Sequence, residues 1–171
     1  MEIITYIRKG AITHKDNLGN TGVTKAGDVQ VMSAGTGIVH SEYNLGEEDT
    51  ELFQIWVQTD RSGHTPRWDT RKFPVAGRGA KLEPLASGRA GHSEALMIHQ
   101  NAALFGATLE AGESVGHTLE PGRKVYMVAV RGTVLINGHE APPRAGVAVS
   151  NEADILIKAQ QPGEVVLLDL S

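Results

Sequence analysis

The chain has 171 residues, 40% of them hydrophobic, and a formal net charge of −4 at pH 7. This composition predicts a folded chain of one domain or two small ones, and it does not favour nucleic acid or a membrane surface as a partner. The lack of cysteine excludes disulfides, thiolate metal sites and a cysteine nucleophile.

The first ten residues, MEIITYIRKG, carry an acidic residue at position 2 and no long apolar core. They are therefore not expected to act as a signal peptide. Elsewhere no apolar run is long enough to span a bilayer as a helix. We expect a soluble, cytoplasmic protein.

Short apolar runs separated by glycine-containing turns predict strands in the first half of the chain. The expected strands cover residues 3–8, 11–14, 29–32 and 52–58. In the last of them, Phe53, Ile55 and Val57 share one face, while Gln54 and Gln58 lie on the other.

The pattern weakens over residues 60–95, which are rich in Gly, Pro and Arg and which we interpret as a connector draped over the surface. Strands are expected again at residues 125–130, 133–136, 147–149, 155–157 and 165–168. Asn137-Gly138 predicts a tight turn between two of these strands. Helical periodicity is nearly absent, with one helical turn expected at residues 101–105.

The most suggestive local motif is Ser33 to Glu42, SAGTGIVHSE. Residues i and i+2 of a strand project from the same face, so His40 and Glu42 can point together into a barrel. An imidazole nitrogen and a carboxylate oxygen suit Fe, Mn, Ni, Cu or Zn. Alternatively, the strand is an edge, with Glu42 in water and His40 bonded to a backbone carbonyl. The preceding Gly-Thr-Gly is expected to form the bend that turns His40 inward.

Several segments resemble the pirin family. They are EIITYIRKGAITHKDNLGNTG, AGDVQVMSAGTGIVHSEYN and FQIWVQ in the first half, and GRKVYMVAVRGTVLINGHE in the second. The resemblance covers nearly the whole chain. It implies an all-β bicupin, in which two antiparallel cupin barrels pack together and the first binds a metal.

The resemblance divides the chain into an N-terminal cupin barrel over residues 1–59, a connector over 60–95 and a degenerate C-terminal cupin barrel over 96–171. It assigns His40 and Glu42 as metal ligands, with Fe the expected metal and Ni, Mn, Cu or Zn the alternatives. In the C-terminal barrel, Leu119 and Lys124 stand near positions where cupin ligands would fall, so that barrel is expected to be metal-free.

The chain departs from the family at its start. In pirins a His-x-His pair precedes the first strand matched here and supplies two further ligands, whereas this sequence begins at Met1-Glu2. A short paralogue, a misplaced start codon and a trimmed form are three open explanations. The first barrel is therefore expected to lack its opening strands and half of its ligands. A barrel so shortened would expose an unpaired sheet edge near residues 1–15 and is expected to form homo-oligomers there.

The remaining titratable and aromatic candidates are expected to have structural or solvated positions. Glu2 is expected to be frayed and solvated because it is the second residue. His14 is expected to flank a turn at the surface, His64 and His92 to be solvated, and His139 to be exposed. Trp56, Trp68 and Tyr126 are expected to pack in the core or against the connector.

The resemblance implies two functions. The first is a metal-dependent quercetin 2,3-dioxygenase, acting on a small aromatic flavonol with His40 and Glu42 as half of the metal's ligands. The alternative is a non-catalytic binding or regulatory module that acts through protein–protein contacts.

Overall fold

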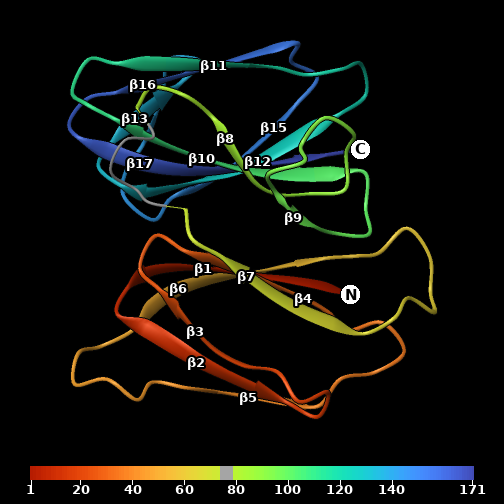
Figure 1. Ribbon diagram of the computed structural model, residues 1–171. Coiled ribbons are helices and arrows are strands. Elements are labelled where there is room, and N and C mark those ends of the chain that lie inside the picture. Colours follow the sequence, from red (N-terminus) through yellow and green to blue (C-terminus); the bar gives the residue numbers. More distant parts are fainter. Residues whose placement is uncertain (74–78) are drawn as a thin grey trace. The chain divides into compact units, whose positions relative to one another are not determined.

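The computed structural model describes residues 1–73 and 79–171, which form β-strands joined by turns and loops (Figure 1). Within these residues, no helix has the length and apolar character needed to cross a membrane. The chain divides into two compact units. The first comprises Met1–Pro74 and Ala86–Asn101, and the second comprises Val75–Leu85 and Ala102–Ser171.

The first unit contains two antiparallel sheets (Figure 1). One has the order β6-β1-β4-β7, formed by β6 (Glu51–Val57), β1 (Glu2–Lys9), β4 (Val29–Ser33) and β7 (Arg67–Arg71). The other has the order β3-β2-β5, formed by β3 (Thr21–Lys25), β2 (Ala11–Asp16) and β5 (His40–Tyr43). Gly10 joins β1 to β2 at φ +69°, a conformation that glycine adopts without a steric penalty.

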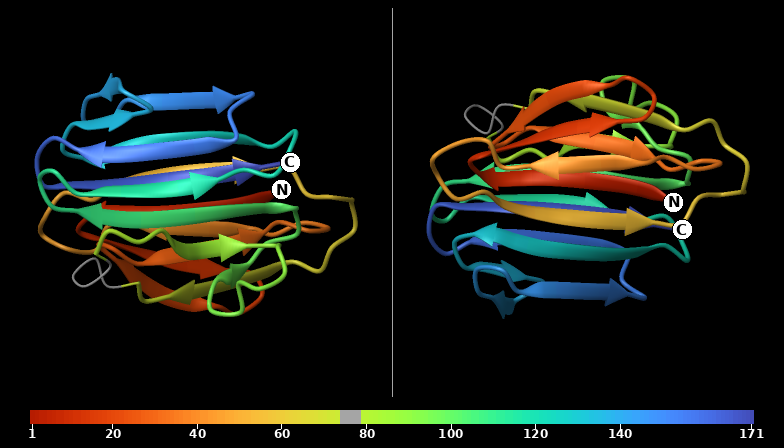
Figure 2. Two further views of the ribbon diagram at one scale, coloured as in Figure 1. Left: turned by 90° about the horizontal axis from the view of Figure 1, so that it is seen from above. Right: turned by 90° about the horizontal axis from the view of Figure 1, so that it is seen from below.

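The second unit also contains two sheets, whose long strands are seen from two further directions in Figure 2. The first contains, in order, β15 (Gly146–Ser150), β12 (Lys124–Arg131), β17 (Gly163–Leu170), β10 (Ala102–Leu109) and β8 (Glu83–Ser87). The second contains β11 (Ser114–Thr118), β16 (Asp154–Ala159), β13 (Val134–Ile136) and β14 (His139–Ala141). The end of β8 that belongs to the first unit pairs with β9 (Leu96–Met97).

The interior of the second unit contains a large apolar cluster, beside buried charged residues such as Asp169. Alternate residues of β16 are buried, as expected for a strand with one face on a core. The buried cluster consists of Ala103, Phe105, Ala107, Leu109, Leu119, Val125, Met127, Ala129, Val134, Ile136, Ala141, Ile155, Ile157, Ala159, Val165 and Leu167.

The Asn-Gly turn is confirmed. Asn137 and Gly138, both at positive φ, join β13 to β14. The helical turn expected at residues 101–105 is wrong, because β10 begins at Ala102 and pairs along its length with β17. Sequence-distant pairing overrides a weak local signal here.

The range expected to be a connector, residues 60–95, contains strands β7 and β8. Strand β7 pairs with β4 from Val29↔Arg71 to Ser33↔Arg67 and so belongs to the first sheet. Local composition hid this strand because it combines charged residues with a single tryptophan and lacks a clean apolar alternation.

The exposed sheet edge expected near residues 1–15 is also wrong. Strand β1 lies between β6 and β4, and β2 lies between β3 and β5. The strands at the ends of these two sheets are β6, β7, β3 and β5. Oligomer formation stays a prediction, but these described strands near the N-terminus are already paired on both sides.

Glu164 provides a pH-dependent test of the second unit. Burial in β17 raises the pKa of its carboxyl from 4.5 to about 7. Between these values the unfolded chain has released the proton that the folded chain retains, so the free energy of unfolding falls as pH rises, by about 3 kcal/mol at most. We expect Glu164→Gln to remove this fall, making the variant more stable than wild type at pH 8. Urea unfolding at pH 5 and pH 8 measures the free energy of unfolding of each protein. Glu140→Gln, which changes an exposed carboxyl, is the control and should show the same fall as wild type.

Candidate functional site

Polar side chains lie on the facing sides of the two sheets of the first unit, most of them buried or half-buried and three of them, His40, Gln54 and Trp56, exposed at the margin. We call this set the polar layer. Its members are Thr5, His14, Thr24, Gln30, His40, Glu42, Gln54, Trp56, Trp68 and Thr70. Because burial of polar groups costs free energy unless they are paired, such a layer indicates a role that an apolar filling would not serve.

Strand register explains why these residues meet. Thr5 on β1 is the partner of Gln30 on β4 and of Gln54 on β6, so all three side chains project from the same face of that sheet. On the other sheet, His14 on β2 is the partner of Glu42 on β5. Hydrogen bonds from Gln30 and Gln54 to Glu42 then cross between the sheets.

Glu42 is held from two strands. Its Oε1 accepts a hydrogen bond from Gln30 Nε2, and its Oε2 accepts one from Gln54 Nε2 at 3.5 Å. His14 Nδ1 lies 3.9 Å from Oε1. The carboxylate is thus fixed in orientation mainly by neutral amide donors, an arrangement that leaves its negative charge available to a cation.

His14 is fully buried, which corrects the expectation of a turn-flanking surface position. Its ring stacks on Trp68, with centroids 4.8 Å apart and an interplanar angle of 6°. Its Nε2 lies 3.0 Å from Asp16 Oδ2. The carboxylate can only accept, so we assign the proton to Nε2 and a lone pair to Nδ1.

Asp16 fixes this histidine tautomer. Burial would raise the pKa of Asp16, but hydrogen bonds from His14, Asn20 and Leu18 outweigh burial and lower the pKa from 3.8 to about 2. Asp16 is therefore ionised near neutral pH, and it holds His14 with Nδ1 toward Glu42.

Two buried polar atoms of the layer have no hydrogen-bond partner within residues 1–73 and 79–171. They are His14 Nδ1 and Thr5 Oγ1. Buried polar groups in folded proteins are nearly always paired, and each exception calls for an explanation such as an ion or a ligand. Both atoms belong to the layer that contains Glu42.

His40 lies at the exposed margin of the polar layer, opposite Asp16 in the β2–β5 register. Its ring stacks on His14 with centroids 5.6 Å apart and an interplanar angle of 19°. His40 and Glu42 therefore both lie on the side of β5 that meets His14, although His40 is exposed rather than turned fully inward. Strand β5 does end its sheet, as the alternative expects, but Glu42 is bonded to Gln30 and Gln54 rather than left in water, and the described contacts hold no bond from His40 to a backbone carbonyl.

The bend before β5 depends on glycine. Gly35 has φ +52°, and a Cβ there would lie 2.3 Å from the backbone oxygen of His64. That same oxygen accepts a hydrogen bond from Thr36 N at 3.0 Å. The Gly-Thr-Gly segment thus packs backbone against backbone, which explains its composition.

The donors of the polar layer fit a divalent transition metal in kind. His40 and Glu42 provide one imidazole and one carboxylate, and His14 Nδ1 is a further lone pair close to Glu42. They fall short in number, because the described part of the chain holds no group of three or more His, Cys, Asp or Glu arranged to bind a metal ion. Such sites commonly use three or four protein ligands.

A second polar cluster in the first unit surrounds Glu2, which is fully buried rather than frayed. Ser33 Oγ donates to Glu2 Oε2 at 2.8 Å, and His99 Nδ1 lies 3.2 Å from Glu2 Oε1. His64, expected to be solvated, is 7% exposed, stacks on His99 and lies 2.6 Å from Asp60 Oδ1 through its Nε2. These partners are 31 to 97 residues from Glu2 or lie in the expected connector, so local reasoning could not find them.

Trp56 corrects another expectation. Its side chain is 63% exposed on β6, an end strand of its sheet, so it does not fill a core. Its Nε1 donates to Gln54 Oε1 at 2.9 Å, which connects it to the polar layer. Tyr126 is exposed as well, so it does not pack in the core either. Trp68 does pack as expected, because its ring stacks on that of the buried His14.

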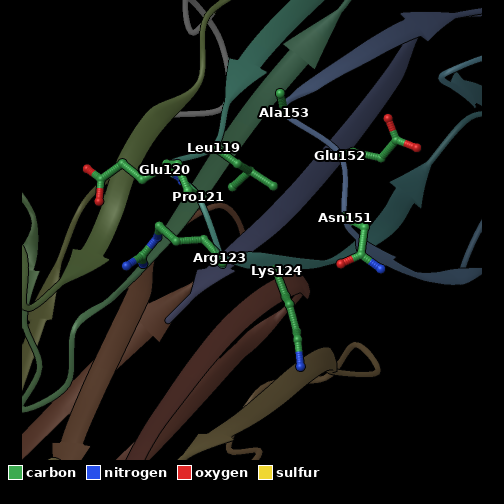
Figure 3. Close-up of a pocket in the computed structure, with 9 residues that line it drawn as sticks. Leu119, Glu120, Pro121, Arg123, Lys124, Asn151, Glu152 and Ala153 are labelled. Atoms are coloured by element: carbon green, nitrogen blue, oxygen red, sulfur yellow. The ribbon is translucent and has the colours of Figure 1, made fainter.

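The second unit contains a pocket of about 300 Å³ (Figure 3). Glu120 and Arg123 lie on one side of it, and Asn151 and Glu152 on the other (Figure 3). Arg123 is bound to Asp169 at 2.5 Å through Nε, so its charge is already paired. This pocket combines loop residues of both charge signs, and it offers weaker chemistry than the polar layer.

Comparison with known proteins agrees with this architecture. The Pirin profile matches residues 1–57, and the profile of the quercetinase C-terminal cupin domain matches residues 85–170. A provisionally named quercetin 2,3-dioxygenase of Pseudomonas aeruginosa is 52% identical over all of this chain and 74% of its own length. The quercetin 2,3-dioxygenase of Escherichia coli K12 is 41% identical over 99% of this chain and 72% of its own length.

Solved structures show the same relationship. The structure of YhhW from Escherichia coli superposes with a TM-score of 0.92 at 38% identity, covering 99% of this chain and 71% of that one. Bacterial pirin YhhW in complex with nickel(II) superposes with a TM-score of 0.90 at 38% identity, covering 99% and 72%. By fold, by sequence identity and by the profiles that match both halves, this chain belongs to the pirin family.

Proposed function

We propose that this protein is a metal-dependent oxygenase of the quercetin 2,3-dioxygenase type, with His40 and Glu42 among the metal's ligands. One observation carries the proposal. Glu42 is a carboxylate set between two sheets and oriented by amides, with the His14 imidazole 3.9 Å away and the His40 ring stacked on His14. Its setting differs from that of the buried Asp169 of the second unit, which is ion-paired with Arg123.

The relatives support the choice of chemistry. The Escherichia coli protein named quercetin 2,3-dioxygenase is 41% identical, and the structure of bacterial pirin YhhW in complex with nickel(II) supports a divalent transition metal as the ligand. When bound, such a metal would supply the Lewis-acid and redox chemistry of an oxygenase.

The residues of this chain have distinct tasks in the proposal. Glu42 supplies negative charge, and His40 supplies a nitrogen donor at the accessible margin of the layer. Asp16 holds the buried His14 with its lone pair toward Glu42, so this part of the site attracts cations or protons rather than anions. Exposed Trp56 adds an aromatic surface near Gln54 that suits a planar flavonol.

The direct test is aerobic consumption of quercetin by protein loaded separately with Fe²⁺, Ni²⁺ or Mn²⁺, followed by absorbance and oxygen uptake. We expect turnover with at least one metal and its loss in His40→Ala. His139→Ala, which removes an exposed histidine of the second unit, serves as the matched control and should retain activity. Protein that binds no metal and leaves quercetin unchanged would contradict the proposal and favour a non-catalytic binding role.

A further inference from the structure

Each glutamine that binds Glu42 is itself bound by a tryptophan. Trp56 Nε1 donates to Gln54 Oε1 at 2.9 Å, and Trp68 Nε1 donates to Gln30 Oε1 at 3.3 Å. The chain has two tryptophans, and both are used in this way. Thr24 Oγ1 adds a second donor to Gln30 Oε1 at 3.1 Å.

These bonds determine which way each amide faces. An indole N–H can only donate, so it selects the oxygen end of the glutamine amide. The NH₂ end must then point away from the indole, and in both cases it meets an oxygen of Glu42. A flipped amide would place oxygen against carboxylate and NH₂ against indole N–H, losing two hydrogen bonds at once.

We infer that Trp56–Gln54 and Trp68–Gln30 form two relays that orient the carboxylate of Glu42, one on each oxygen. The four residues are positioning residues, and the inference rests on the proposed role of Glu42 as a metal ligand. Each relay keeps one donor on one carboxylate oxygen and leaves the remaining lone pairs for the metal. Outer partners of this kind typically contribute about 10- to 100-fold to metal affinity.

The Trp56–Gln54 relay is the suitable one to test because both side chains are exposed, so their truncation leaves the buried members of the polar layer in place. We expect Gln54→Ala to weaken Ni²⁺ binding about tenfold and Trp56→Phe by a smaller factor of about three. The double variant should bind no more weakly than Gln54→Ala, because Trp56 acts through Gln54. Isothermal titration calorimetry measures the Ni²⁺ affinity of these three variants. Gln160→Ala, which truncates an exposed glutamine, is the control and should bind Ni²⁺ as wild type does.

Additive losses in the double variant, or unchanged affinity in both single variants, would overturn the relay while leaving the metal site intact. Wild-type protein that fails to bind Ni²⁺ would instead count against the proposed function. In that case the existence of the relay is tested in metal-free protein, through the indole N–H signal of Trp56 in a ¹H–¹⁵N spectrum. Glu42→Gln should move this signal, and Gln54→Ala should abolish that response; an unresponsive signal would overturn the relay.

Discussion

Glu42→Gln is expected to weaken Ni²⁺ binding by more than about 100-fold, beyond the range typical of outer partners. The substitution keeps the size of the side chain but removes the negative charge that attracts a cation. It also introduces an NH₂ group opposite the amide donors of Gln30 and Gln54, so one hydrogen bond is replaced by a clash of donors. Equilibrium dialysis with metal analysis measures the change.

Glu48→Gln is the matched control, since it removes an exposed carboxylate of the same unit outside the polar layer. Its affinity for Ni²⁺ should equal that of wild type. If both variants lose affinity equally, general surface charge accounts for binding and Glu42 has no special role. If neither loses affinity, the metal binds elsewhere.

Leu167→Ala is expected to lower the free energy of unfolding by about 3–5 kcal/mol. Leu167 is fully buried on β17, which lies between β12 and β10 in its sheet, and it belongs to the apolar cluster of the second unit. Truncation removes buried apolar surface and leaves a cavity that strands paired on both sides cannot easily collapse. Urea unfolding monitored by circular dichroism measures the loss.

Leu156→Ala provides the comparison within the same unit. Leu156 is 54% exposed on β16, so the same truncation should cost less than about 0.5 kcal/mol. Equal losses at the two positions would contradict the assignment of Leu167 to a close-packed core.

Local sequence patterns predicted much of the fold. Alternation located β6, the Asn-Gly pair located the β13–β14 turn, and the i, i+2 spacing predicted that His40 and Glu42 share a face, although their neighbour His14 was not expected there. Each of these features depends on residues within a few positions of one another, where backbone geometry alone decides direction.

The polar layer was less accessible to prediction, although one signal was present. Ile12, His14 and Asp16 alternate along β2 and are buried, so the alternation that begins at Ile12 could have placed His14 inside. Gln54 was assigned to the face opposite Phe53 and Ile55, which is correct, but only the pairing of sheets shows that this face meets Glu42. The fixed orientation of the carboxylate thus depends on tertiary contacts.

The strands within residues 60–95 could not be predicted for a related reason. Trp68 is the one strongly apolar residue of β7, and its contact is with His14, more than fifty residues earlier. The burial of Glu2 likewise depends on His99, 97 residues away. Local periodicity carries no information about partners at such separations.

The most direct test of the metal-site assignment is paramagnetic broadening in ¹H–¹⁵N spectra as Mn²⁺ is added to the metal-free protein. Both tryptophans belong to the polar layer, so their two indole N–H signals should broaden first and saturate at one ion per chain. Sharp indole signals at one equivalent, or first broadening at residues outside the polar layer, would contradict the assignment of His40 and Glu42 to a metal site.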